Sequence, residues 1–254
     1  MKKFVTFITS LLIAFSFTKT VLADGHQIYG PYPITLKGYD GDKTNSVKYT
    51  GQMARHALHD SLKAVVKTGD VAKMMAYYNG EDGLAIVAPA SKGDFVIKQT
   101  MISEIGSGNL SGKMYKGYIP GWGNLTGPEA IEHMMAKAGE VEGGFDPNTG
   151  MDYTQLISKF AMGAVFYNQA VNSYLGSKME IGQKPNSEPY KEGAYYTGKE
   201  HSWDEAFGYW GSAAHALTLT AEQNYNVAKK KDMASADFNG DGVVDVYSEY
   251  TYAH

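Results

Sequence analysis

Apolar residues recur at helical spacing along several stretches of the chain, and this pattern predicts a helical protein. The longest stretch, 153–175, has a broad apolar face and small central residues that would allow close helix packing. Shorter stretches with the same period predict helices over 50–66, 95–105, 200–216 and 220–230. No run of alternating strands, internal repeat or low-complexity tract interrupts them. The pattern therefore favours an all-α fold arranged as a helical bundle.

Two further helices are marked by the residues at their starts. Asp70 can accept a hydrogen bond from the first turn of a helix that follows it. Thr126 is followed three residues later by Glu129, which is the spacing of a capping box. Between these two helix starts, we interpret residues 79–125 as a long loop, which is glycine-rich over 106–127.

Residues 1–23 have the features of a secretory signal peptide. A basic start is followed by an apolar run from Phe4 to Phe17 and by a small-x-small site that ends at Ala23. The run contains hydroxyl residues and is short for a bilayer span, which favours a cleaved leader over an anchor. We expect cleavage after Ala23, export to the periplasm or the medium, and no stable membrane insertion afterwards. Residues 24–50 are then an extended N-terminal arm, and 51–254 form the helical domain.

The charge balance excludes one class of partner. The chain has 23 basic and 27 acidic residues; the leader removes three lysines, which leaves 20 against 27 and a formal charge of −7. Arg55 is the single arginine. Recognition of phosphates and guanines depends on arginine, so no nucleic-acid partner is expected. The chain has no cysteine, so core packing or bound metal must stabilise an exported fold without disulfides.

An acidic segment near the C-terminus has the spacing of an EF-hand calcium loop. With Asp237 as position 1 of the loop, oxygen-bearing side chains occupy positions 1, 3, 5 and 9. Gly242 stands at position 6, where an EF-hand loop turns sharply. Position 12 is Ser248, and Glu249 follows it, so the loop either closes through Glu249 or lacks its bidentate ligand. The alternative is an ordinary Asn-Gly-Asp-Gly turn. The predicted ligands of a structural calcium ion are Asp237, Asn239, Asp241, the carbonyl of Val243, Asp245 and Glu249.

A second constellation lies in the predicted helix that starts near residue 200. His201, Asp204 and Glu205 fall on one helical face, and a histidine with carboxylates at this spacing can hold a transition metal inside a bundle. The alternative is a helix start, where acids interact favourably with the helix dipole and His201 is a capping residue. The tryptophans of the same segment are expected in the core. Further ligands could come from His56, His59, Asp60, His133 and His215.

Three segments of the chain resemble a known family. They are Tyr49-Thr50-Gly51-Gln52-Met53-Ala54-Arg55, the block from His201 to Tyr209, and the segment from Asp237 to Tyr250. Together they resemble a bacterial envelope family catalogued as domain of unknown function 4856, which is regarded as imelysin-like. The resemblance implies an α-helical fold, because imelysins are exported proteins with two helical bundles, linked to iron uptake.

The resemblance also bears on the metal and on the end of the chain. Imelysins carry Gly-x-His-x-x-Glu, which Gly198, His201 and Asp204 approximate, with Glu205 as a nearby substitute. It therefore implies iron as the candidate metal, and zinc would suit the same donors. Because a calcium loop needs the helix that leaves it, we expect that C-terminal helices of the family are missing from this chain.

These features predict an exported, non-enzymatic binding protein for iron or another transition metal, with a structural calcium ion. Its partners would be the metal or another component of the envelope. One alternative is an envelope hydrolase, since imelysins were once classed as peptidases. No Ser/His/Asp or zinc peptidase pattern supports that alternative. Another alternative is a calcium-stabilised surface module that binds glycan or protein, for which the tyrosines and glycines of 106–125 are suited.

Overall fold

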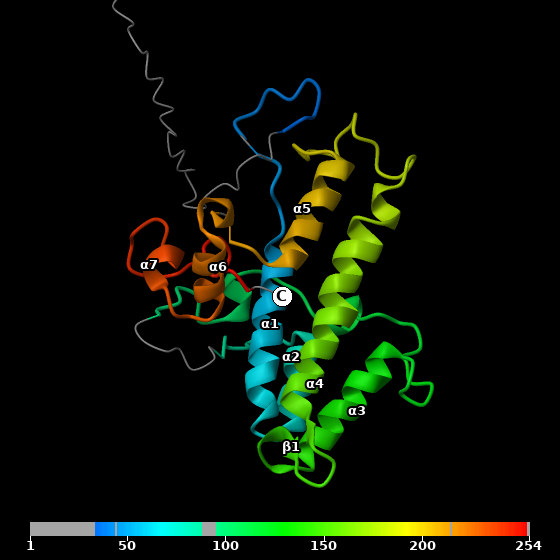
Figure 1. Ribbon diagram of the computed structural model, residues 1–254. Helices are drawn as coiled ribbons and strands as arrows, with labels where there is room; N and C mark the ends of the chain where they lie inside the picture. The colour runs from blue at the N-terminus through cyan, green and yellow to red at the C-terminus, as the bar shows by residue number, and fades with distance from the viewer. Residues whose placement is uncertain (1–33, 44, 88–94, 214, 253–254) are drawn as a thin grey trace, which may run out of the picture.

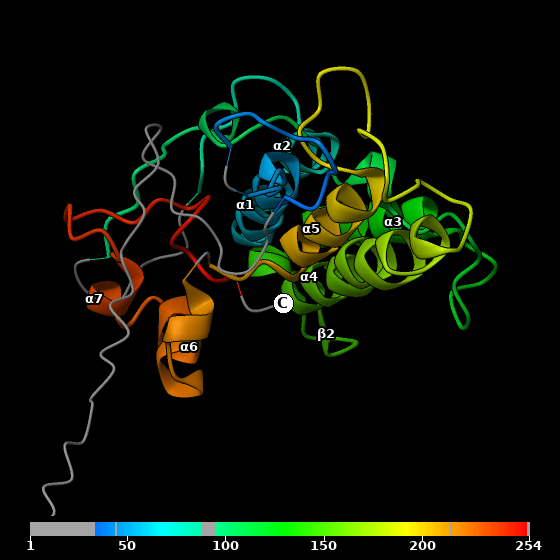
Figure 2. The ribbon, with the colours of Figure 1, turned by 90° about the horizontal axis from the view of Figure 1, so that it is seen from above.

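Helix α1 (Thr50–Val66) lies at the centre of the molecule, and most other helices pack against it (Figures 1 and 2). The structure is a computed structural model that describes residues 34–43, 45–87, 95–213 and 215–252. The expected leader and its cleavage site lie outside the described residues. The remaining α-helices are α2 (Val71–Asn79), α3 (Gly127–Gly139), α4 (Tyr153–Ala161), α5 (Gly198–Trp210), α6 (Ala221–Ala228) and α7 (Met233–Ala236).

The longest helix changes type along its length. Helix α4 continues directly into the π-helix η4 (Met162–Tyr174), so the helix predicted over 153–175 is confirmed in its extent. Within η4, Leu175 N donates to Ala170 O at 2.9 Å, a bond between residues five apart. Most π-helices are single turns, whereas this one has 13 residues. Apolar periodicity alone does not separate this geometry from an α-helix.

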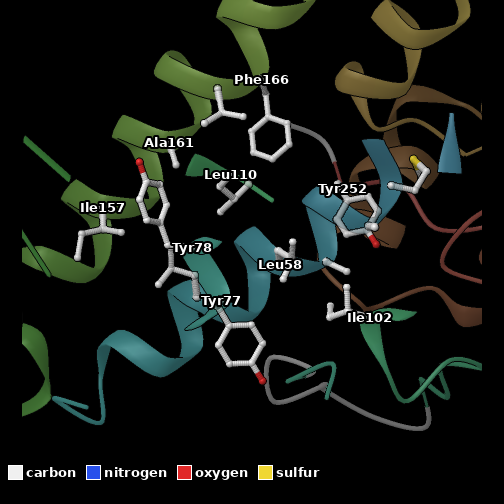
Figure 3. Close-up of a cluster of buried hydrophobic side chains, with 14 of the residues drawn as sticks. Leu58, Tyr77, Tyr78, Ile102, Leu110, Ile157, Ala161, Phe166 and Tyr252 are labelled. Carbon is white, nitrogen blue, oxygen red and sulfur yellow. The ribbon is translucent and has the colours of Figure 1, made fainter. Parts of the chain in front are cut away.

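The core is a cluster of aliphatic and aromatic side chains between α1, α2, α4 and the loops that cross them. Leu58 of α1 lies near the middle of the cluster and is fully buried, and Tyr78 of α2 lies between it and Ile157 of α4 in the view of Figure 3. Phe166 of η4 closes the cluster toward Tyr252 (Figure 3). Because the chain contains no cysteine, this packing supplies most of the stabilisation of the described fold.

Both predicted helix caps are confirmed. Asp70 accepts a hydrogen bond from Lys73 N at 2.9 Å at the start of α2. At the start of α3, the Glu129 carboxylate accepts bonds from the backbone and the hydroxyl of Thr126, both at 2.7 Å. Helix α5 ends at Trp210, earlier than predicted, because Gly211 adopts the left-handed conformation that terminates helices.

The helix predicted over 95–105 is wrong. Residues 95–101 are extended: Ile97 forms a parallel bridge with Val244, and Met101 an antiparallel bridge with Ala85. Side chains alternate between buried and more exposed from Phe95 to Lys98, which is the period of a strand. The short turn η1 (Ile102–Glu104) is the part of this stretch that is helical.

The described residues also contain one small hairpin and several short turns. Strands β1 (Phe145–Asp146) and β2 (Met151–Asp152) pair antiparallel before α4. The protein is therefore mostly helical, as predicted, although not without strands. No helix in the described part of the chain is long and apolar enough to cross a membrane. The other 3-10 turns are η2 (Ser111–Lys113), η3 (Glu142–Gly144), η5 (Ser177–Met179) and η6 (Ala216–Thr218).

Candidate metal sites

Helix α5 begins with a capping box that also fixes the N-terminal arm. Thr197 N donates to the Glu200 carboxylate at 2.6 Å, and Glu200 N donates back to the Thr197 hydroxyl at 3.2 Å. The second oxygen of Glu200 accepts a bond from Thr35 N at 2.5 Å. Sequence reasoning did not identify this cap, although Thr197 and Glu200 have the required spacing. The cap sets the position of His201 in the first turn of α5.

The imidazole of His201 lies between two carboxylates of its own helix. Its Nδ1 is 3.4 Å from Asp204 Oδ1, and its Nε2 is 3.4 Å from Glu205 Oε2. The rings of Tyr190 and Tyr196 stand against the imidazole, with centroids at 4.6 and 5.0 Å. The structure therefore brings the three predicted residues together, but the two carboxylates contact opposite edges of the ring.

Asp204 is the buried member of this group. One of its oxygens accepts a hydrogen bond from Lys48 N of the arm, and the other faces His201. Burial raises the pKa of Asp204 to about 7, against the opposing effect of the His201 contact.

Glu205 is more accessible and is positioned by helix α1. Gln52 Nε2 donates to Glu205 Oε1 at 2.8 Å, so its other oxygen is directed toward His201. Burial raises the pKa of the Tyr174 phenol, and the negative charge of Glu205 raises it further. Lys178 lies with its ammonium 3.4 Å from the centroid of the Tyr174 ring, and burial lowers the pKa of Lys178 to about 8. The Glu205 side of the site therefore contains carboxylate, phenol and amine groups.

The other suggested donors are occupied elsewhere. His56 stacks between Phe166 and Tyr252, and burial lowers its pKa to about 3. His59 Nε2 contacts the Ser158 carbonyl at 3.0 Å, while its Nδ1 is 3.7 Å from Asp60. The remaining two histidines also have partners: His215 contacts the Ser235 carbonyl and His133 the Trp122 ring. Across the ranges that the structure describes, no three His, Cys, Asp or Glu side chains converge as a metal-binding group.

The expectation that the tryptophans of α5 lie in the core is wrong. Trp203 is 49% exposed and Trp210 is 62% exposed, whereas Tyr209 is buried. The buried face of α5 contains small residues, and a Cβ added at Gly208 would lie 2.7 Å from Tyr49 Cβ. Close approach to α1 thus requires the small side chains to face inward, and this turns the large indoles outward.

The acidic C-terminal segment forms a tight loop. The Asp237 carboxylate accepts backbone N–H groups from Gly240, Asp241 and Gly242, at 2.8 to 3.1 Å. The side chains of Asn239 and Asp241 each accept a bond from the backbone two residues on. These bonds hold the first three predicted ligand side chains on one turn of the chain, and the calcium site itself stays a prediction.

The far end of the loop is closed by Glu249. Its two carboxylate oxygens accept bonds from Asn239 N at 3.2 Å and Asp245 N at 2.9 Å, and burial raises its pKa. Asp245 is directed toward the extended segment 95–99, where it contacts Lys98 and Gln99. The backbone of Lys98 also donates to Val244 O at 3.0 Å. Sequence reasoning missed this pairing because it interpreted 95–105 as a helix.

Comparison with known proteins identifies one family. A family model described as Domain of unknown function (DUF4856) matches residues 126–248. This range runs from the cap of α3 through the His201 group to the acidic loop, and so contains the block from His201 to Tyr209 and all but the last two residues of the segment from Asp237 to Tyr250. No curated protein and no solved structure matches the chain. Residues 126–248 of the chain therefore form a DUF4856 domain.

Proposed function

We propose that this protein is an exported, non-enzymatic binding protein that holds a divalent transition-metal ion between His201 and Glu205. The observation that supports it is the placement of His201 between two carboxylates. Imidazole and carboxylate together suit zinc and iron, the two metals expected from the sequence.

The separation of the two donor atoms fits a shared ion. Nitrogen and oxygen ligands lie about 2.1 Å from a bound zinc, so two of them at a tetrahedral angle are roughly 3.4 Å apart. His201 Nε2 and Glu205 Oε2 have that separation already. These two residues would be the protein ligands, and the remaining positions would be available to water or to a bound molecule.

Both ligands are positioned by a second residue. Asp204 contacts the opposite ring nitrogen of His201, and Gln52 donates to the free oxygen of Glu205. Metal-binding histidines generally have a carboxylate or carbonyl at their other nitrogen, which fixes the tautomer and the ring orientation. Asp204 is therefore a positioning residue in this proposal and not a third ligand.

The acidic loop is proposed as a separate, structural calcium site with the six predicted ligands. Its carboxylates and carbonyl are hard oxygen donors, whereas the α5 site includes an imidazole, so the two sites should prefer different ions. The Asp237 turn supports this assignment, because its hydrogen bonds bend the chain tightly between positions 1 and 5 of the predicted loop.

The test is a zinc titration of the chelator-treated protein by calorimetry. His201→Ala and Glu205→Gln should abolish zinc binding, and Asp204→Asn should weaken it about tenfold to a hundredfold. Binding should also weaken as the pH falls, because zinc coordination requires a neutral imidazole. His133→Ala is the matched control, since this histidine lies on α3 beside Trp122. Equal zinc binding by the wild type and His201→Ala, with both folded by circular dichroism, would disprove the site.

A further inference from the structure

A groove runs along α4 and η4, and none of its lining residues belongs to either candidate metal site. It consists of two adjoining hollows of about 370 and 290 Å³, which share Lys159 and Phe160. The segment 106–126 crosses to this side of the long helix before it enters α3 (Figure 1). From Gln155 to Asn172, the groove follows the helix for roughly 20 Å, given a rise of about 1.5 Å per α-helical residue and less in a π-helix.

The π-helix determines which side chains line the groove. Its hydrogen bonds join residues five apart, so side chains four and five positions apart share a face. Gly163, Tyr167, Asn168 and Asn172 follow this spacing and all line the first hollow. In an α-helix the same residues would spread over a wider arc. The unusual helix type thus aligns one aromatic ring and two amides along one surface.

The opposite wall is fixed to the helix by hydrogen bonds. Tyr115 N donates to Ala164 O at 2.8 Å, and Gln169 Nε2 donates to Lys113 O at 2.9 Å. These bonds hold the aromatic ring of Tyr115 on the far side of the hollow from η4. Because both walls are hydrogen-bonded to each other, the groove is formed before any ligand arrives, which lowers the entropy cost of binding.

The chemistry of the lining indicates the class of ligand. In the first hollow, the side chains of Tyr167 and Tyr115 are 63% and 42% exposed. Phe160 and Trp122 line the second hollow. The polar lining groups are chiefly amides, and Lys159 is the one charged residue among those that line the two hollows. A ligand that fits must offer apolar C–H faces to the rings and hydroxyl groups to the amides.

We propose that this groove binds a neutral oligosaccharide. Sugar rings present a C–H face and a rim of hydroxyls, which matches a groove lined by both aromatic rings and amides. An extended peptide would be recognised through an exposed strand edge, but the walls here are a helix and a hydrogen-bonded loop. An amphipathic helix would need an apolar floor along its whole length, whereas the floor of the first hollow contains Gly163, Asn168 and Asn172.

Calorimetry with four soluble hexasaccharides, derived from cellulose, chitin, starch and xylan, tests this proposal. At least one should bind at millimolar concentration or below, with little dependence on salt because the ligand is neutral. Tyr167→Ala removes an exposed ring and should weaken binding at least about tenfold, close to the stacking contribution of an aromatic side chain in other ligand grooves. The matched control is Tyr225→Ala: Tyr225 is 55% exposed on α6, on the other side of α1 (Figures 1 and 2).

A second variant blocks the groove without removing any contact. A Cβ added at Gly163 meets no atom within 4 Å, so Gly163→Leu fills the floor of the groove without a clash at its first atom. It should abolish saccharide binding and leave zinc binding at His201 unchanged. The proposal is overturned if none of the four saccharides binds the wild type, or if Tyr167→Ala and Gly163→Leu bind as the wild type does. It is also overturned if a proline-rich peptide binds the groove and no saccharide does.

Discussion

The ammonium group of Lys98 lies 3.3 Å from Asp245 Oδ2, so a lysine contacts one of the predicted calcium ligands. A calcium ion in the loop and the lysine would compete for the same carboxylate. Lys98 is 53% exposed, and such pairs are weak in water. The lysine should therefore reduce calcium affinity without preventing binding.

Replacing this lysine should raise calcium affinity. We expect Lys98→Met to increase it about twofold to fivefold, the range that an exposed ion pair contributes. Asp241→Ala, which removes a ligand, should weaken binding, while Lys137→Met, another exposed lysine in an ion pair, should change nothing. Calcium titration by calorimetry measures all three. A lower affinity in Lys98→Met would contradict competition at Asp245.

The buried side chain of His56 in α1 should make the stability of the fold decrease in acid. Burial lowers the pKa of His56 to about 3, and the nearby charges of His59 and Arg55 act in the same direction. The unfolded chain takes up this proton near pH 6.5, so between about 6.5 and 3 the native state binds fewer protons than the unfolded state. The stability associated with neutral His56 is thus present above pH 6.5 and lost as the pH falls.

This dependence can be isolated by comparing two proteins. His56→Gln keeps a polar group near the Gly208 carbonyl but cannot titrate. From pH 6.5 to 4.5, the free energy of unfolding of the wild type should fall relative to the variant by up to about 1.4 kcal/mol per pH unit. Urea denaturation at a series of pH values measures the difference. A constant difference over this range would show that His56 does not remain neutral in the fold.

Two adjacent aromatic residues of α5 should differ sharply in their effect on stability. Tyr209 is 1% exposed, and Tyr209→Ala should cost roughly 3–5 kcal/mol through the cavity that it leaves. Trp210 is largely exposed, and Trp210→Ala should change the free energy of unfolding by less than about 0.5 kcal/mol. Chemical denaturation of both variants checks the orientation of the helix. Comparable losses would mean that α5 is rotated from the position described.

The sequence predicted what depends on local spacing. The contacts of His201 with Asp204 and Glu205 follow from helical geometry, and so do the caps at Asp70 and Glu129. The partners that position the site could not be predicted, because Gln52 lies 153 residues from Glu205.

The two clearest failures have different physical causes. The tryptophans of α5 were expected in the core because they are large and apolar. However, α5 approaches α1 closely at Gly208, where a larger side chain would clash, and the indoles lie on the exposed side of the helix. The apolar residues of 95–101 are compatible with the period of a helix and with that of a strand. Tertiary contacts, such as the bridge between Ile97 and Val244, determine that this segment is extended.

The bridge between Ile97 and Val244 also has a consequence for how the chain folds. It joins residues that are 147 positions apart, so the segment at 95–99 can complete its pairing only after residue 244 has been synthesised. In the exported protein proposed above, that step would come after translocation, when extracellular calcium is first available. Contacts of such high separation slow folding, and an ion that stabilises the acidic loop would favour the last pairing to form. Calcium would then influence when the fold is completed as well as how stable it becomes.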